Sequence, residues 1–218
     1  MSIKKTETVV AEIKPLDIKV VPIKIIGDSP LIVHAWSEKA KKMMLDAQTK
    51  ATKTKAREIR NPLDEFIHSM YWLTEVPEST EEAFVKALEN GAKFGFPVGA
   101  IKQAANSAAY RLGWVKNQME LRGAYFLKTE YGDMAQIENS VPEMREDMVR
   151  IGMGSADLRY RAEFKNWEMS MLLQYNASGN MTLEQIINCI NCGGYAVGIG
   201  EWRPEKDGDF GRFHIELS

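Results

Sequence analysis

A run of basic residues offers the first chemistry in this sequence. Between positions 37 and 60 the chain has eight Lys or Arg and three acidic residues, and its second half, "TKATKTKAREIR", is almost without apolar side chains. Basic residues spaced two or three positions apart suit contacts with the phosphates of an extended nucleic-acid strand. The alternative is a solvated helix face or a mobile basic loop. The candidate contacts are Lys50, Lys53, Lys55, Arg57 and Arg60.

A second basic group alternates with aromatic residues in "DLRYRAEFKNW", positions 157–167. Basic side chains beside aromatic rings can combine phosphate contacts with base stacking. The same alternation is also typical of a strand with an aromatic core face and a charged outer face. Arg159 and Arg161 are therefore candidate nucleic-acid contacts, with the strand as the alternative.

The stretch "GIGEWRPEKDGDFGRF", positions 198–213, is rich in glycine. Glycines permit positive φ and leave backbone N–H groups free to face a ligand, and arginines could place their forked donors on phosphates. Four acidic residues outnumber the three basic ones here, so composition alone favours an ordinary hairpin between two strands. The candidate contacts are Gly200, Arg203, Gly211 and Arg212.

The cysteines and histidines give weaker signals. Cys189-x-x-Cys192 has no second Cys/His pair to complete a zinc site, so we expect two core residues, no metal and no other cofactor. His34, His68 and His214 show no ligand spacing. His34 stands between an apolar run and the basic run, where a general base acting on RNA could lie; the alternative is a structural or surface histidine.

The elements that must position these residues include consecutive helices and consecutive strands rather than a strict alternation, which predicts an α+β fold. A Val- and Ile-rich run predicts a strand over about 16–26, in which Pro22 indicates an edge strand or a bulge. Further strands are expected within 121–152, over 167–175 and on both sides of the glycine-rich stretch.

Capping signals predict where the helices begin and end. Two have the S/T-x-x-E/Q form of a capping box, Ser79 with Glu82 and Thr182 with Gln185. The pair Gly193-Gly194 predicts the end of the last helix, since glycine often follows a helix C-terminus. Helices are expected to begin near Ser37, Ser79, Pro97 and Thr182.

Length and composition describe an ordinary globular chain. It has 218 residues, 44% hydrophobic and 27% charged, with a net charge of −2, so nucleic-acid binding would depend on local patches. No apolar run approaches a membrane span, and we expect no signal peptide, no membrane partner and a cytoplasmic location. Residues 1–14 are expected to form a flexible tail and 15–218 one domain, with an insertion at about 60–160.

The end of the chain resembles a known family. A late β-α-β unit with G-x-G-x-x-R, a short polar insert and G-x-F-G-R-F before the last strand is similar to the glycine-rich loop of the RAMP superfamily, the ferredoxin-like RNA-binding proteins of CRISPR effector complexes. The early strand, "SPLIVHAW" and the basic run stand where such proteins place their first β-α unit. The matching loop residues are Gly198, Gly200, Arg203, Gly208, Phe210, Gly211 and Arg212.

This resemblance implies a ferredoxin-like (RRM-like) core with an antiparallel sheet and a helical/β insertion. It also implies a non-enzymatic protein that binds single-stranded nucleic acid, RNA rather than DNA. Such a protein would assemble as a homo-oligomer or with other CRISPR-like subunits, in the cytoplasm of a bacterial host. The chain is similar in overall texture to proteins carried by bacteriophages.

Two alternatives remain open. One is a RAMP-type endoribonuclease in which His34 is the general base and Lys39 or Lys41 stabilises the transition state, although the sequence shows no second histidine or tyrosine at a recognisable spacing. The other is a phage structural subunit or an inhibitor that mimics a CRISPR subunit. The near-neutral net charge suits this protein-only role.

Overall fold

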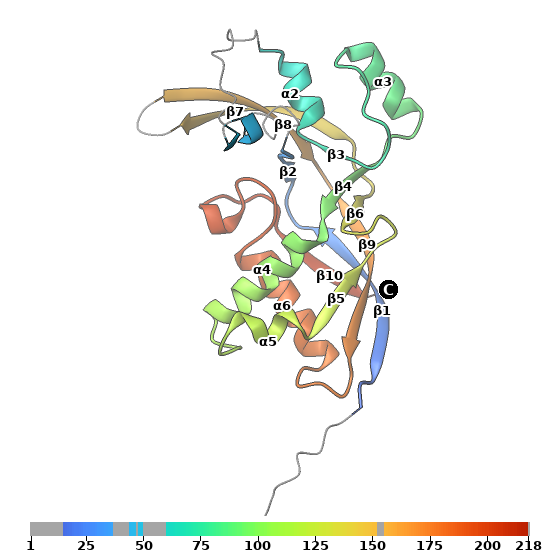
Figure 1. The fold of residues 1–218 in the computed structure, drawn as a ribbon, viewed down its shortest axis with the longest axis vertical. Helices are drawn as coiled ribbons and strands as arrows, with labels where there is room; N and C mark the ends of the chain where they lie inside the picture. The colour runs from blue at the N-terminus through green and yellow to red at the C-terminus, as the bar shows by residue number, and fades with distance from the viewer. Residues whose placement is uncertain (1–14, 37–43, 47, 50–59, 152–154, 218) are drawn as a thin grey trace, which may run out of the picture.

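Figure 1 shows the computed structural model, which describes residues 15–36, 44–46, 48–49, 60–151 and 155–217. These residues form a mixed α+β structure whose sheets are antiparallel, so the predicted α+β class is confirmed. The tail predicted at 1–14 and most of the helix predicted after Ser37 lie outside the described residues.

Four strands form the largest sheet, in the order β10-β1-β9-β5, and each neighbouring pair is antiparallel. Along each strand, side chains alternate between a buried face and an open face. The buried face includes Ile23, Ile25, Met169, Leu173 and Phe213. The strands are β1 (Ile18–Gly27), β5 (Tyr125–Lys128), β9 (Glu168–Asn176) and β10 (Phe213–Leu217).

Pro22 lies in the part of β1 that has one neighbouring strand. β9 pairs with β1 from Ile18 to Ile26, whereas the pairing of β10 begins at Ile23. Proline has no N–H to donate, so it fits a position without a second ladder. The predicted first strand is confirmed, and its first half is an edge.

Two helices, α4 (Val98–Arg111) and α6 (Leu183–Ala196), cover the buried face of this sheet (Figure 1). In the predicted capping box of α6, the Thr182 hydroxyl accepts from the Gln185 N–H, and the Gln185 side chain accepts from the Thr182 N–H. The core of the two helices is small or aliphatic. Its buried side chains include Ile101, Ala104, Ala105, Ile186 and Ile190.

The prediction that Gly193-Gly194 ends the last helix is wrong, because both glycines lie inside α6. A Cβ atom on Gly193 would lie 2.5 Å from the backbone nitrogen of Ala105 in α4, and one on Gly194 would overlap the carbonyl oxygen of Phe213 in β10. The pair is therefore required for close packing of α6 against its neighbours rather than for termination.

A smaller sheet and three further helices lie, together with α4 and β5, in the described segment from Pro62 to Ile137. Asn61 caps the first of these helices, since its side chain accepts from the N–H groups of Leu63 and Asp64. The next helix is capped by Thr80, one residue after the predicted Ser79. The elements are α2 (Pro62–His68), β3 (Tyr71–Trp72), α3 (Glu81–Glu89), β4 (Phe94–Pro97), α5 (Gln118–Arg122) and β6 (Met134–Ile137), with β3-β4-β6 forming the sheet.

A long hairpin, β7 (Pro142–Ile151) with β8 (Ser155–Phe164), extends away from the main sheet (Figure 1). Its inner end pairs with β2 (Leu31–Val33) in the order β2-β8-β7. Phe164 is buried there, whereas Met148 is 73% exposed farther out. The basic and aromatic stretch 157–167 thus includes a strand, as its alternative interpretation predicted.

Candidate functional site

The glycine-rich stretch does not form the predicted hairpin of two strands. Tyr195 and Ala196 belong to α6, and residues 198–212, here called the glycine loop, contain one short 3-10 helix, Pro204–Lys206, before β10 begins. The loop packs along β2: the Glu201 N–H donates to the Ile32 carbonyl at 3.0 Å. At its far end the Gly211 N–H donates to the Pro30 carbonyl at 2.8 Å.

Two of the candidate glycines are required by the chain itself. Gly200 has φ +76°, and a Cβ atom there would lie 2.5 Å from the carbonyl oxygen of Ile32. Gly211 has φ +65°, and a Cβ atom there would overlap the carbonyl oxygen of Ile199. Positive φ and close backbone approach both favour glycine. These glycines therefore hold the loop against β2 and against itself.

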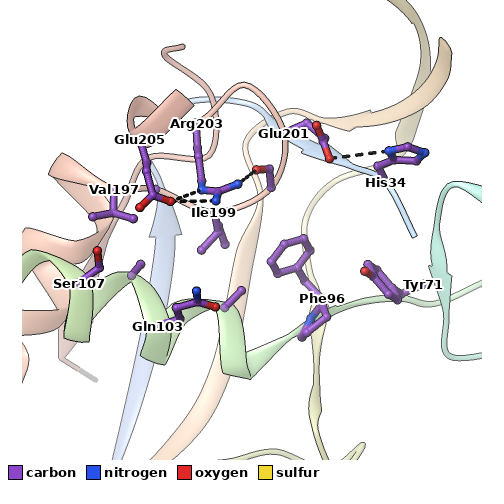
Figure 2. A pocket seen from close by; sticks show the side chains of 15 residues that line it. His34, Tyr71, Phe96, Gln103, Ser107, Val197, Ile199, Glu201, Arg203 and Glu205 are labelled. Carbon is purple, nitrogen blue, oxygen red and sulfur yellow. Dashed lines mark hydrogen bonds and ion pairs between the residues drawn. The ribbon is translucent and has the colours of Figure 1, made fainter. Parts of the chain in front are cut away.

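A cavity of about 250 Å³ lies between the glycine loop and α4 (Figure 2). Successive turns of α4 form the floor of the cavity. They contribute Ala100, Gln103 and Ser107, which share one helix face because they are three or four positions apart. Figure 2 shows Gln103 pointing toward the loop and the rings of Tyr71 and Phe96 at one end.

His34 and Glu201 meet at the end of the cavity nearest β2 (Figure 2). Nδ1 of His34 lies 3.7 Å from one carboxylate oxygen of Glu201, and Nη2 of Arg161 lies 3.7 Å from the other. The His34 ring, followed by the charges of Arg161 and Arg203, holds the pKa of Glu201 below its ordinary value, although partial burial acts in the opposite direction. Glu201 is therefore an ionised carboxylate between an imidazole and a guanidinium.

Arg161 is the buried member of this group, with 6% of its surface exposed. Its Nη1 donates to Asp147 at 3.3 Å, and Arg145 donates to the other oxygen of Asp147 at 2.8 Å. Nε of Arg161 has no hydrogen-bond partner among the described residues. The inner face of the hairpin thus carries a paired charge network directed at the glycine loop.

The guanidinium group of Arg203 donates hydrogen bonds to other residues of the glycine loop. Nε and Nη2 donate to one oxygen of Glu205 at 3.2 and 2.8 Å, and Nη1 donates to the Gly200 carbonyl at 3.0 Å. Arg111 of α4 donates to the other oxygen of Glu205. The two guanidinium groups, Arg203 first, lower the pKa of Glu205. All three nitrogens of Arg203 therefore have protein partners.

The other candidate contacts are only partly described. Arg60 donates to Glu65 at 2.6 and 2.7 Å and reaches Asp157 and the Leu158 carbonyl in β8. Arg159 pairs with Asp157 at 3.0 Å. The backbone N–H of Arg212 donates to the Ser29 hydroxyl at 3.0 Å. The remaining candidates, Lys50, Lys53, Lys55 and Arg57, lie outside the described residues, as do Lys39 and Lys41 of the alternative.

No metal-binding cluster is found where the structure describes the chain. No group of three or more His, Cys, Asp or Glu side chains there could hold an ion. Cys189 is buried and Cys192 half-buried on α6, both as free thiols. His68 lies beside Asp64 and His214 beside Asp28, and neither histidine lines the cavity. Within the same described residues, no helix has the length and apolarity to cross a bilayer.

Sequence reasoning missed most of the cavity. Tyr71, Gln103 and Ser107 carry no motif, and only the fold brings them to the cavity that Glu201 also lines. A partial signal existed in α4, whose first turns place Gln103 and Ser107 on one face. His34 was identified as a candidate, but its neighbour Glu201 was counted only among the acidic residues of the loop.

Comparison with protein-family models gives no match to this chain, and comparison with curated proteins gives none either. The arrangement on which function can be argued is therefore the cavity together with the sheet that supports it.

Proposed function

We propose that this protein binds single-stranded nucleic acid, RNA in preference to DNA, as a RAMP-like subunit. The observation that carries the proposal is the connectivity of the main sheet. In chain order its parts are β1, α4, β5, β9, α6 and β10, and the strands lie side by side as β10-β1-β9-β5. Numbered from one to four, this is the order 4-1-3-2 with both helices on one face, as in a ferredoxin-like β-α-β-β-α-β fold.

The position of the glycine loop supports the same proposal. It connects α6, the second helix of that core, to β10, its last strand. This is the position at which RAMP proteins carry their glycine-rich loop. The loop forms one wall of the cavity, so a strand that binds along the loop would also pass the cavity.

The basic run supplies the electrostatic attraction in this proposal. It follows His34 and Trp36 in the chain and leads to Arg60, which is bound to β8. Four described cations on or beside the hairpin have acidic partners, namely Arg60, Arg145, Arg159 and Lys165. Lys50, Lys53, Lys55 and Arg57 therefore carry most of the proposed phosphate contacts.

Assembly into an oligomer is part of the proposal, and the outer half of the hairpin supports it. Met148 is 73% exposed and its cross-strand neighbour Leu158 is 40% exposed. Exposed apolar side chains that are adjacent on a projecting element suit contact with another protein surface. Light scattering after size exclusion, with and without a single strand, measures this directly.

The test is fluorescence anisotropy with a labelled single-stranded RNA, the same DNA sequence and a duplex, over a range of salt concentrations. We expect single-stranded RNA to bind most tightly, and log K to fall linearly with log salt because phosphate contacts release counterions. The variant Lys53→Glu/Lys55→Glu/Arg57→Glu should lose at least about tenfold in affinity at low salt.

A variant with the same change of charge elsewhere is the control. Lys86→Glu/Lys116→Glu/Lys128→Glu changes three exposed lysines on α3, on the α4–α5 connection and on β5. It should bind within about threefold of the wild type, apart from the general effect of net charge. Absence of binding at low salt, or equal losses in the two variants, would refute the proposal.

One observation favours endoribonuclease activity as a second candidate. Tyr71 lines the same cavity as His34, which supplies the second residue that the sequence spacing did not show. In this reaction His34 takes the proton of a 2′-OH, the 2′-oxygen bonds to the adjacent phosphorus, and the bond to the 5′-oxygen breaks. The leaving 5′-oxygen takes a proton from a general acid, for which Tyr71 is the candidate.

Cleavage of structured RNA, followed on denaturing gels, tests this candidate. The expected products carry a 2′,3′-cyclic phosphate, and His34→Ala should abolish them. His214→Ala is the matched control, since that histidine lies beside Asp28 and outside the cavity. Equal cleavage by both variants would exclude His34 as the base.

A further inference from the structure

The cavity between α4 and the glycine loop has the size and shape for a single small ring system. Its volume of about 250 Å³ lies just below the range of roughly 300–1,000 Å³ that is usual for drug-sized ligands. At one end the rings of Tyr71 and Phe96 stand edge to face, with centroids 6.1 Å apart. Phe96 is 5% exposed and Tyr71 is half-buried, so the Tyr71 ring offers the larger surface against which an aromatic ligand can pack.

The charges around the cavity largely cancel. Arg203 is held by Glu205 and by the Gly200 carbonyl, so its donors are occupied. Glu201 stands between His34 and Arg161 at 3.7 Å from each. A phosphate would have to displace Glu205 from Arg203 to gain a forked contact. The cavity therefore favours an uncharged ligand over an anion.

The floor of the cavity offers donors and acceptors without protein partners. Gln103 is exposed and Ser107 half-buried, the described residues provide no hydrogen bond to either side chain, and Figure 2 shows Gln103 on the side of α4 that faces the loop. A glutamine amide presents two donor hydrogens and one acceptor oxygen. It can bind the adjacent donor and acceptor on one edge of a planar heterocycle, as glutamine does with N6 and N7 of adenine.

We propose that this cavity receives one unstacked nucleobase, with adenine as the base that Gln103 matches best. The ring lies against Tyr71 and Phe96, and the Gln103 amide bonds its polar edge. This inference rests on the proposed function, because a base belongs to the strand that the protein is proposed to bind. It adds a position at which binding depends on the identity of the base rather than on phosphate charge.

The experiment uses free nucleosides, so that it does not depend on binding of a whole strand. Adenosine, guanosine, cytidine and uridine are titrated against the full-length protein, with binding followed by saturation-transfer NMR and by calorimetry. We expect adenosine to bind most tightly. Gln103→Leu, which removes the amide and keeps a side chain of comparable bulk, should weaken adenosine binding by about tenfold or more. Ala100→Phe, which fills the cavity, should abolish it.

Gln174→Leu is the matched control, because Gln174 lies on β9 and outside the cavity lining. It should leave adenosine binding unchanged. Thermal unfolding of each variant establishes that the fold is retained. If no nucleoside binds the wild type, or if Gln103→Leu and Ala100→Phe bind adenosine as the wild type does, the base-binding cavity is overturned.

A second titration separates this inference from the proposed function. The protein is titrated with a labelled RNA and with the same RNA carrying a single abasic site in place of one adenosine. Strand binding that is unaffected by Ala100→Phe, with no nucleoside binding, overturns the cavity and leaves the proposed function standing. Adenosine binding lost in Ala100→Phe, without any strand binding, supports the cavity and refutes the proposed function.

Discussion

Glu201 and Arg161 face each other at 3.7 Å across the boundary between the glycine loop and the β7–β8 hairpin. Arg161 is buried, whereas the Glu201 side chain is 41% exposed and lines the cavity. The loop and the hairpin, which are separate in the chain, are thus joined by a carboxylate whose ionisation depends on both.

This relationship predicts a specific dependence of stability on pH. The pKa of Glu201 is lower in the folded chain than its ordinary value, so ionised Glu201 stabilises the fold above the unfolded pKa. This contribution is lost as the pH falls through the folded pKa. Between about pH 6 and pH 3, wild type should therefore lose more free energy of unfolding than Glu201→Gln. Urea unfolding followed by tryptophan fluorescence measures it, and parallel pH curves for the two proteins would contradict the prediction.

Gly211→Ala should destabilise the protein strongly. The position has φ +65°, and the added Cβ would overlap the carbonyl oxygen of Ile199. We expect a loss of more than about 2 kcal/mol. Gly91→Ala is the control, since Gly91 has φ +78° with no atom within 4 Å of a Cβ. Its loss should be about 1 kcal/mol. Chemical denaturation of both variants measures the free energy of unfolding. Equal decreases in the two variants would mean that the glycine loop can rearrange to accommodate the added Cβ.

Gly193→Ala should loosen the contact between α6 and α4. The added Cβ would lie 2.5 Å from the Ala105 backbone, which cannot move without its helix. Gly99→Ala is the counterpart in α4, where no atom lies within 4 Å of a Cβ. Within a helix, alanine is more favourable than glycine by about 0.5–1 kcal/mol. Differential scanning calorimetry should therefore show a lower Tm for Gly193→Ala and an unchanged or higher Tm for Gly99→Ala.

The two thiols should react slowly in the folded protein. Burial raises the pKa of both Cys189 and Cys192, and the thiolate is the reactive form. At about pH 8, Ellman's reagent should modify Cys192 slowly and leave Cys189 unmodified until the chain unfolds. Cys192→Ser isolates Cys189 in the same assay. Rapid modification of that variant without denaturant would show that α6 opens readily.

Local chemistry in the sequence predicted the parts of the fold that depend on neighbouring residues. The capping box of Thr182 and Gln185 and the strand around Ile23 are of this kind, because their partners lie within a few positions or follow from alternation. Gly193 and Gly194 were misread for the converse reason. Their partners, Ala105 and Phe213, belong to other elements. The preference for glycine after a helix end therefore gave the wrong prediction, because the sequence alone does not show these tertiary contacts.

The candidate site divides in the same way. Gly200, Gly211 and Arg203 were found from composition, but the structure uses them to hold the glycine loop, through the Ile32 carbonyl and through Glu205. Gln103 could not be found, because a single glutamine on a helix has no signal until the opposite wall is known. His34 lies in the cavity lining, as a residue between an apolar run and a basic one, yet only the fold places Glu201 beside it.

The order of strands in the main sheet has a consequence for synthesis of the chain. β1 emerges from the ribosome well before its two neighbours, β9 and β10, are made. Until then β1 has unpaired edges, and its contacts join residues nearly two hundred positions apart, such as Ile25 and Ile215. Such long-range pairing closes slowly. The nascent chain therefore completes its central sheet only after β10 has been made, and a chain truncated before β10 would leave Ile23–Gly27 as an unpaired edge open to aggregation.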